Sequence, residues 1–300
     1  MSTSHVVRRA ADAGWSAASG PLAKADGFET WFAVDGSTAA VHTGFSVGRL
    51  APGGALPTHL HAYEESLYVL DGEVVVQTAG EAALLGPGDY GLIPLGVEHS
   101  LRNEGAAEVR WARMSAPAPR ADHDGDTYLA PELAPTEPVR PDVRDPRTRR
   151  YGHIDPEHMD PGQQSQERLA VSASMRTALL VYSGITVKMM IDSDLGAELS
   201  TMFMVQYEAT GRIGGHDHPF EETYLILDGS VEATFDGTSY VLEPGDVAWA
   251  GVGCVHGFTP VGGRSVRWLE TQAPQPPGRH AYRFARDWDH LVQRLEGSGT

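Results

Sequence analysis

The chain of 300 residues repeats its most distinctive residues at one constant spacing. Residues 59–99 contain two histidines two apart, a glutamate, an Asp-Gly pair, a Pro-Gly-Asp tripeptide and a third histidine. The same residue types recur 157 positions later, within residues 216–256, without a gap. Many matches at a single offset indicate a duplicated domain. We therefore expect two similar domains, 1–115 and 167–300, joined by residues 116–166.

Both halves have the pattern of short β-strands. The runs LYVL and EVVVQ flank Asp71-Gly72, and YLIL and SVEATF flank Asp228-Gly229. Asp-Gly between two β-prone runs predicts a hairpin, and a third such pair stands at Asp236-Gly237. Pro-Gly-Asp precedes a further β-prone run in each half. Many short strands with Gly and Pro turns predict an all-β barrel or jelly roll.

Two segments differ from this pattern. Residues 116–166 contain nine prolines and few apolar residues, which predicts a linker or an arm lying over a domain. At the C-terminus, Phe284, Trp288, Leu291 and Leu295 recur at helical spacing. We expect a short amphipathic helix that packs on a barrel, with a partner-binding helix as the alternative.

Charge and composition exclude several classes of partner. The formal net charge of −17 argues against nucleic acid, because phosphate binding needs a basic surface. No apolar run approaches the ~20 residues of a membrane helix, and the first twenty residues lack the apolar core of a secretory signal. Cys254 is the single cysteine, so no intrachain disulfide forms. We expect a cytoplasmic protein with a small-molecule partner.

The residues around the first two histidines divide between two faces. In an extended segment alternate side chains share a face, so His59, His61 and Glu65 point one way and Glu64 the other. Three such side chains on one buried face are costly unless something neutralises or coordinates them. Alternation predicts that Glu64 and its counterpart Glu221 face outward, with hydrogen bonding to the histidines as the alternative.

The repeated motifs resemble those of the cupin superfamily. HLHAYEESLYVLDG matches the first cupin motif, with His-x-His, three residues, Glu, six residues and Gly. GDYGLIPLGVEHSLRN, residues 88–103, matches the second motif. The second copy keeps the pattern, with Gly251 at the position of Pro94 and Pro260 at that of Asn103. The resemblance covers about 45–120 and 197–272 and implies a bicupin, two tandem double-stranded β-helix barrels.

The resemblance implies one metal ion in each barrel, held by three histidines and one glutamate. Two imidazoles on one strand, a carboxylate near the next strand and a later histidine give a set of three nitrogens and one oxygen. That set suits Mn, Fe(II), Co, Ni, Cu or Zn, and ligand type alone does not choose among them. We expect Fe or Mn first, then Zn, Ni, Cu or Co. The expected ligands are His59, His61, Glu65 and His99 in the first copy and His216, His218, Glu222 and His256 in the second.

Several other side chains are candidates to line the pockets. Cys254 shares the parity of His256 and is a candidate extra ligand or labile thiol, with a small buried residue as the alternative. The other candidates are explained equally well by core packing. They are Tyr90, Trp249, Met202 and Met204.

The family includes many activities, so the fold does not decide the function. We expect an Fe(II)- or Mn-dependent dioxygenase that acts on a small oxygenated metabolite. The alternatives are a non-redox isomerase, hydrolase or aminohydrolase similar to ureidoglycine aminohydrolase, and a non-catalytic small-molecule-binding cupin. Oxalate decarboxylases also carry two full sites, with four residues rather than three between His and Glu. We favour the second copy for catalysis and expect a homodimer, because barrels expose sheet edges.

Overall fold

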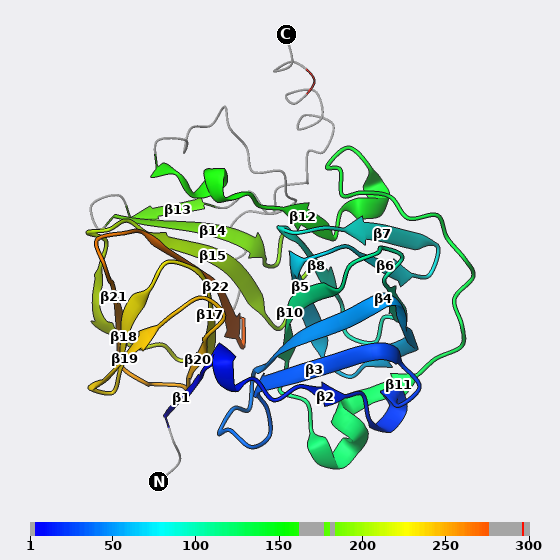
Figure 1. The fold of residues 1–300 in the computed structure, drawn as a ribbon, viewed down its shortest axis with the longest axis horizontal. Coiled ribbons are helices and arrows are strands. Elements are labelled where there is room, and N and C mark those ends of the chain that lie inside the picture. The colour runs from blue at the N-terminus through cyan, green and yellow to red at the C-terminus, as the bar shows by residue number, and fades with distance from the viewer. Residues whose placement is uncertain (1–3, 162–176, 181–183, 276–295, 297–300) are drawn as a thin grey trace.

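Two β-barrels lie side by side in the computed structural model (Figure 1), which describes residues 4–161, 177–180, 184–275 and Glu296. The all-β tandem-barrel fold is therefore confirmed. Short 3-10 turns are the other elements among residues 4–161: η1 (Ala10–Asp12), η2 (Gly20–Leu22), η3 (Ala121–Asp126), η4 (Pro146–Thr148) and η5 (Pro156–Met159). The expected C-terminal amphipathic helix lies outside the described residues.

The first barrel is one curled sheet of eleven strands. Its long strand β4 pairs with four neighbours and so connects the two sides of the barrel. The strands are β2 (Ser16–Ala17), β3 (Asp26–Val34), β4 (Gly44–His61), β5 (Glu64–Asp71), β6 (Val74–Thr78), β7 (Glu81–Leu85), β8 (Asp89–Ile93), β9 (His99–Arg102), β10 (Val109–Ala116), β11 (Thr127–Leu129) and β12 (Tyr151–His153).

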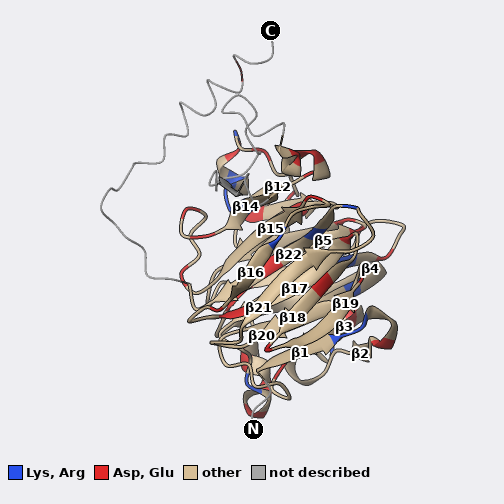
Figure 2. Ribbon diagram, turned by 90° about the vertical axis from the view of Figure 1, so that its left-hand side faces the viewer, with Lys and Arg blue, Asp and Glu red and all other residues tan. Residues whose placement is uncertain are grey.

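The second barrel is built from a seven-stranded and a four-stranded sheet. The larger sheet runs in the order β1 (His5–Arg8), β20 (Val247–Ala250), β17 (Glu221–Asp228), β22 (Val266–Ala273), β15 (Thr201–Tyr207), β14 (Ile185–Ile191) and β13 (Thr177–Leu180) (Figure 2). The smaller sheet contains β16 (Ile213–His216), β21 (His256–Pro260), β18 (Val231–Phe235) and β19 (Thr238–Leu242). Strand β1 belongs to the expected segment 1–115, yet it pairs with β20 of the second barrel.

The Asp-Gly pairs serve two different structural purposes. Asp236-Gly237 closes the predicted hairpin, because Phe235 pairs with Thr238. The hairpin prediction at Asp71-Gly72 is wrong: β5 pairs with β8 and β10, whereas β6 pairs with β7 and β9. The chain turns a corner between the two sides of the barrel there. Gly72 has φ of +72°, and a Cβ atom on it would lie 2.5 Å from the carbonyl oxygen of Glu108. Asp228-Gly229 turns the equivalent corner in the second barrel.

The segment between the copies is an arm on the first barrel over its described part, residues 116–161. Strand β11 pairs with the end of β4, and β12 pairs with β8. Thr127 in β11 is the pairing partner of His61, so the arm covers the strand that carries the first two histidines. No helix among the described residues is long and apolar enough to cross a membrane.

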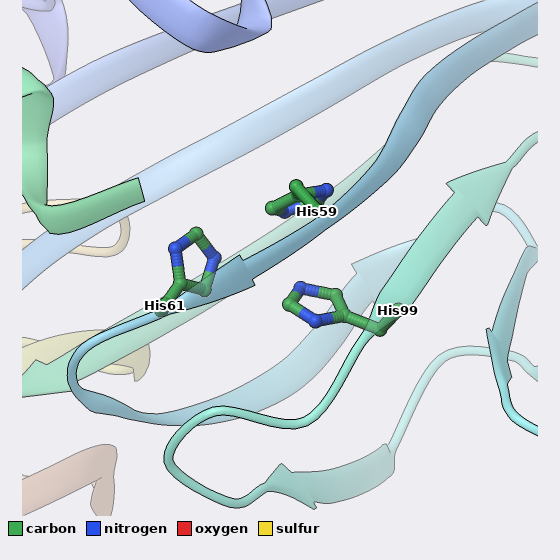
Figure 3. A group of neighbouring side chains, drawn as sticks. All are labelled: His59, His61 and His99. Carbon is green, nitrogen blue, oxygen red and sulfur yellow. The ribbon is translucent and has the colours of Figure 1, made fainter. Parts of the chain in front are cut away.

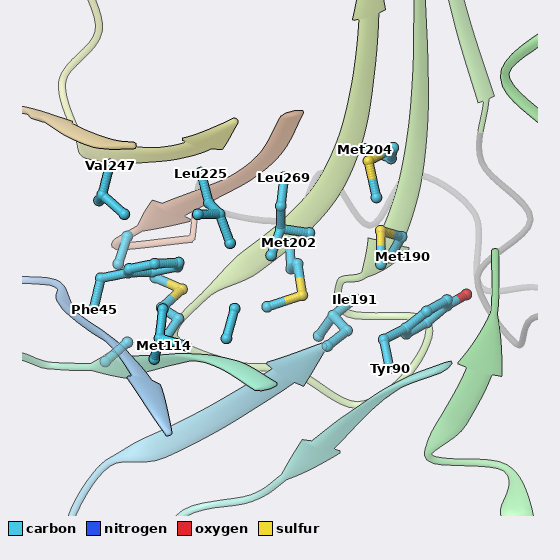
Figure 4. Close-up of a cluster of buried hydrophobic side chains, with 14 of the residues drawn as sticks. Phe45, Tyr90, Met114, Met190, Ile191, Met202, Met204, Leu225, Val247 and Leu269 are labelled. Carbon is cyan, nitrogen blue, oxygen red and sulfur yellow. The ribbon is translucent and has the colours of Figure 1, made fainter. Parts of the chain in front are cut away.

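A third hydrophobic core lies between the two barrels (Figure 4). Each barrel has its own interior core, and the outward faces of β5, β8 and β10 meet those of β14, β15 and β17 in the third one. We call this cluster the inter-barrel core. It contains Tyr90, Trp249, Met202 and Met204, all at most 2% exposed. These four side chains therefore pack in the inter-barrel core, and the prediction that they line the metal pockets is wrong.

Candidate metal centres

Three histidines converge inside the first barrel (Figure 3). His59 and His61 come from the end of β4 and His99 from the start of β9, where His99 pairs with His59. The ring centroids are 4.1 Å apart for His59 and His99, 4.8 Å for His59 and His61, and 5.0 Å for His61 and His99. Glu65 completes the group, with its Oε2 atom 3.4 Å from Nε2 of His61. All four side chains are at most 2% exposed.

The unused nitrogens of this group fit a metal ion. The Nδ1 atoms of His59 and His99 lie 2.7 Å and 2.9 Å from the carbonyl oxygens of Pro57 and Val97, which fixes the proton on Nδ1. The Nε2 lone pairs therefore face the centre. Within the described residues, no hydrogen-bond partner reaches the buried Nε2 atoms of His61 and His99. Orphaned acceptors of this kind are costly, and a divalent cation would satisfy them.

Burial keeps these imidazoles neutral. It lowers the pKa of His59 to about 2 and that of His99 to about 4, with neighbouring histidines adding to the effect. Burial also lowers the pKa of His61. For Glu65, burial raises the pKa, but Arg113, His61 and His99 together outweigh burial and bring the pKa below its usual value. Neutral imidazoles and a carboxylate are the protonation states that bind metals.

The second barrel contains an equivalent group. The ring centroids of His216, His218 and His256 lie 4.5–5.4 Å apart. Glu222 approaches Nε2 of His256 at 3.1 Å and Nε2 of His218 at 3.5 Å. The Nδ1 atoms of His216 and His256 each lie 2.9 Å from a backbone carbonyl oxygen. The donor set has the same residue types as the first, but here Nε2 of His256 is paired with Glu222. Although burial lowers the pKa of His256, its hydrogen bonds with Glu222 and the carbonyl group of Cys254 raise it above its usual value.

The two centres differ in how far they open to solvent. The side chain of His218 is 28% exposed, whereas that of its counterpart His61 is 2% exposed. An aromatic ring stacks on this histidine in both centres, Tyr63 on His61 at 4.2 Å and Phe220 on His218 at 4.6 Å. In the first barrel, Thr127 of the arm also contacts Nδ1 of His61 at 2.9 Å. The second centre is therefore the more accessible.

The glutamates of the two centres, Glu65 and Glu222, have neighbouring side chains of opposite charge type. Arg113 donates to Glu65 Oε2 at 2.5 Å from inside the first barrel. The residue 157 positions later is Glu270, which is 8% exposed. Burial and the neighbouring Glu222 raise the pKa of Glu270 well above its usual value. One centre thus has a fixed cation beside its glutamate and the other a second carboxyl group.

Neutral donors position Glu222 in the second centre. Gln272 donates to Oε1 at 2.5 Å, and the hydroxyl of Tyr224 donates to Oε2. Although burial raises the pKa of Glu222, hydrogen bonds from His256 and Tyr224 bring it below its usual value. Arg113, Glu270 and these donors were not singled out from the sequence. The signal was present, because the offset of 157 residues also aligns WARMSAP with WLETQAP.

Glu64 and Glu221 point away from the metal centres, as alternation predicts, but they are buried rather than solvated. Glu221 accepts hydrogen bonds from the backbone N–H groups of residues 41–43 in the first barrel. Glu64 accepts them from the backbone N–H groups of residues 198–200 in the second. Because 41–43 and 198–200 are also 157 positions apart, the two contacts are reciprocal. We call them the glutamate clasps.

Cys254 does not join the second centre. Its carbonyl oxygen bonds His256, but its thiol groups with His5 and Asp236 instead. Burial and Asp236 raise the pKa of the thiol to about 11. The prediction that Cys254 and His256 share a face is wrong, because residues 251–255 form a loop before β21, where strand alternation does not apply.

A cavity of about 660 Å³ lies in the first barrel beside its metal centre. Its walls come from β3, residues 16–22 and residues 119–127. Tyr63, Arg113 and Thr127 line it and also contact His61 or Glu65. None of the first centre's histidines lines the cavity, so these three side chains separate it from the centre.

Comparison with known proteins places both motif regions in one family. The family model described as a cupin domain matches residues 46–115 and 203–271. No curated protein matches the sequence. A solved structure from Pseudomonas aeruginosa, described as a glyoxylate-induced protein, has a TM-score of 0.64 at 17% identity, covering 94% of this chain and 93% of that one.

Two oxalate decarboxylases have the same fold, with similar TM-scores and sequence identities. The enzyme from Lactobacillus farciminis, solved with formate, has a TM-score of 0.63 at 15% identity and covers 92% of this chain and 88% of that one. The enzyme from Bacillus subtilis has a TM-score of 0.62 at 14% identity, covering 92% of this chain and 78% of that one. At these identities the similarity establishes the fold.

Proposed function

Because the chain belongs to the cupin superfamily, with one cupin domain in each half, we propose that it is a metal-dependent enzyme acting on a small oxygenated metabolite at its second centre. The observation that carries the proposal is the open group of His216, His218 and His256 with Glu222. Substrate can approach this centre past His218, whereas the arm covers the equivalent histidine of the first centre.

The chain's own residues would orient the reacting groups. A bound Fe or Mn ion would supply Lewis acidity or redox chemistry to the substrate's oxygens. Tyr224 and Gln272 hold both oxygens of Glu222, and backbone carbonyl groups fix the rings of His216 and His256. Such fixed partners keep a ligand set in one geometry through turnover. The first centre, closed and with Arg113 beside its glutamate, would be a structural or regulatory metal site.

We propose dioxygenase chemistry first and a decarboxylase as the second candidate. The set of three nitrogens and one oxygen supports the dioxygenase, since it suits Fe(II) and Mn. The similarity in fold to oxalate decarboxylases supports the second candidate, and the Bacillus subtilis enzyme is described as containing Mn(II) centres. The two chemistries differ in a measurable way, because a dioxygenase consumes O2 in proportion to product and a decarboxylase releases CO2 without net O2 uptake.

The test compares O2 uptake and CO2 release in three forms of the protein. Wild type, His61→Ala and His218→Ala are loaded with Fe(II) or Mn(II) and supplied with oxalate and other small oxygenated acids. We expect O2 uptake in proportion to product in wild type and His61→Ala, and its loss in His218→Ala. CO2 release without net O2 uptake would refute the dioxygenase activity and support the decarboxylase activity. Loss in His61→Ala alone would move the reaction to the first centre, and no turnover with either metal would refute the enzyme.

A further inference from the structure

A separate group of metal-ligating side chains lies on the second barrel, outside both histidine centres. His5, Asp236 and Cys254 each place one ligand atom within 4.8 Å of the other two. They come from three distant segments: strand β1, the turn between β18 and β19, and the loop before β21. Cys254 is 2% exposed, whereas Asp236 lies at the surface. The group therefore has one buried and one solvent-facing side.

The imidazole of this group is held in a fixed orientation. His5 Nε2 lies 3.0 Å from the hydroxyl of Tyr240, and the ring stacks on Phe235 at 5.4 Å with 16° between the planes. Backbone pairing of β1 with β20 fixes the main chain of His5 opposite Ala250. Tyr240 engages Nε2, and the hydroxyl of Ser4 lies 3.3 Å from Nδ1. A metal ion would bind at Nδ1 in place of that hydroxyl, with Tyr240 as the outer partner that sets the ring.

The turn between β18 and β19 positions the carboxylate of Asp236, and the loop before β21 positions the thiol of Cys254. Asp236 has φ of +47°, a left-handed conformation, and its Oδ1 atom accepts a hydrogen bond from the N–H of Val255 at 2.9 Å. That bond ties the β18–β19 turn to the residue next to Cys254. The carboxylate is also hydrogen-bonded to the side chains of Ser4 and Cys254, so a metal ion would replace these contacts. Three donors are thus brought together by packing that does not depend on the histidine centres.

We propose that His5, Asp236 and Cys254 form a third metal site, suited to a divalent ion of the zinc class. Thiolate sulfur, imidazole nitrogen and carboxylate oxygen are the donors that Zn²⁺ takes in proteins, and three protein ligands leave the fourth position to water. Binding forms a metal–sulfur bond and releases the thiol proton to solvent. The ion would join the N-terminal strand to the β18–β19 turn of the second barrel.

The single cysteine gives this site its own spectroscopic readout. Co²⁺ added to the full, untagged chain should produce a thiolate-to-cobalt charge-transfer band in the near ultraviolet, which can arise only from Cys254. We expect a final band intensity equal to one thiolate-bound cobalt ion per chain, its disappearance on adding excess Zn²⁺ and its absence in Cys254→Ser. His5→Ala and Asp236→Asn should each weaken this binding by about tenfold or more, the range that loss of outer partners already reaches.

Controls separate this site from the histidine centres. His61→Ala and His218→Ala should keep the band, since neither residue belongs to the group. The proposal is overturned if wild type gives no band while equilibrium dialysis shows cobalt bound to the chain. It is also overturned if His5→Ala and Asp236→Asn leave the band and its affinity unchanged, because Cys254 would then bind with other residues. The wild-type result decides the question even where a variant fails to fold.

Discussion

Replacing Glu221 by alanine removes one glutamate clasp and tests how the two barrels are joined. The carboxylate accepts four hydrogen bonds from residues 41–43, at 2.8–3.0 Å. Val41 is 64% exposed and His42 is half-buried, so water can replace the carboxylate at their N–H groups. Thr43 is 0% exposed, so its N–H and hydroxyl would stay buried without an acceptor.

The magnitude follows from those two groups. A buried donor left without a partner costs about 1–3 kcal/mol, so Glu221→Ala should lower the free energy of unfolding by roughly 2–6 kcal/mol. That is a large fraction of the ~5–15 kcal/mol that stabilises a folded domain. Glu64→Ala should lose a similar amount, because it leaves the N–H and hydroxyl of the buried Ser200 unpaired in the same way.

The measurement is urea denaturation of wild type and variants, with stability taken from linear extrapolation. Glu73→Ala is the matched control. Glu73 is also ion-paired, to Arg140 at 2.6 Å, but both side chains are exposed, so its loss should cost at most about 1 kcal/mol. If Glu221→Ala costs no more than Glu73→Ala, the clasp does not stabilise the contact between the barrels.

Two further predictions concern charge. Arg113→Met should tighten Mn²⁺ binding at the first centre by roughly tenfold or more, because it removes the positive charge that is paired with the expected ligand Glu65. Isothermal titration in a His218→Ala background measures this, and Arg113→Lys should not reproduce it. The hydrogen bond with Asp89 raises the pKa of His153 from 6.5 to about 9. The stability that this bond gives the folded protein is therefore complete below pH 6.5 and lost as the pH rises through 9. The unfolding temperature should change less between pH 6 and pH 10 in His153→Gln than in wild type. An equal change in both proteins would contradict the raised pKa of His153.

The sequence predicted the parts of the molecule that depend on fixed local spacing. Both four-residue sets converge in the structure, as the repeated motifs predict, because metal ligands occur as particular residue types at particular separations. Their role as metal ligands stays a prediction. The metal itself, the homodimer and the cytoplasmic location stay predictions. Alternation also placed Glu64 and Glu65 on opposite faces, but it could not say that the second barrel lies against Glu64.

The errors arose where tertiary pairing decides between equal local patterns. Asp71-Gly72 fits a hairpin and a corner between sheets equally well, because both need a glycine with positive φ. The four-residue strand β1 has no sequence signal for joining the other barrel. Tyr90 and Trp249 are large and apolar, which suits a pocket wall and an inter-barrel core alike.

Metal content per chain tests the central claim, two independent cupin centres, most directly. Mn²⁺ is the ion of choice, because it prefers oxygen and nitrogen donors and so avoids the thiol of Cys254. After loading and dialysis, elemental analysis should give two equivalents in wild type and one each in His61→Ala and His218→Ala. Wild type without bound manganese, or a single substitution that removes both equivalents, would contradict the account.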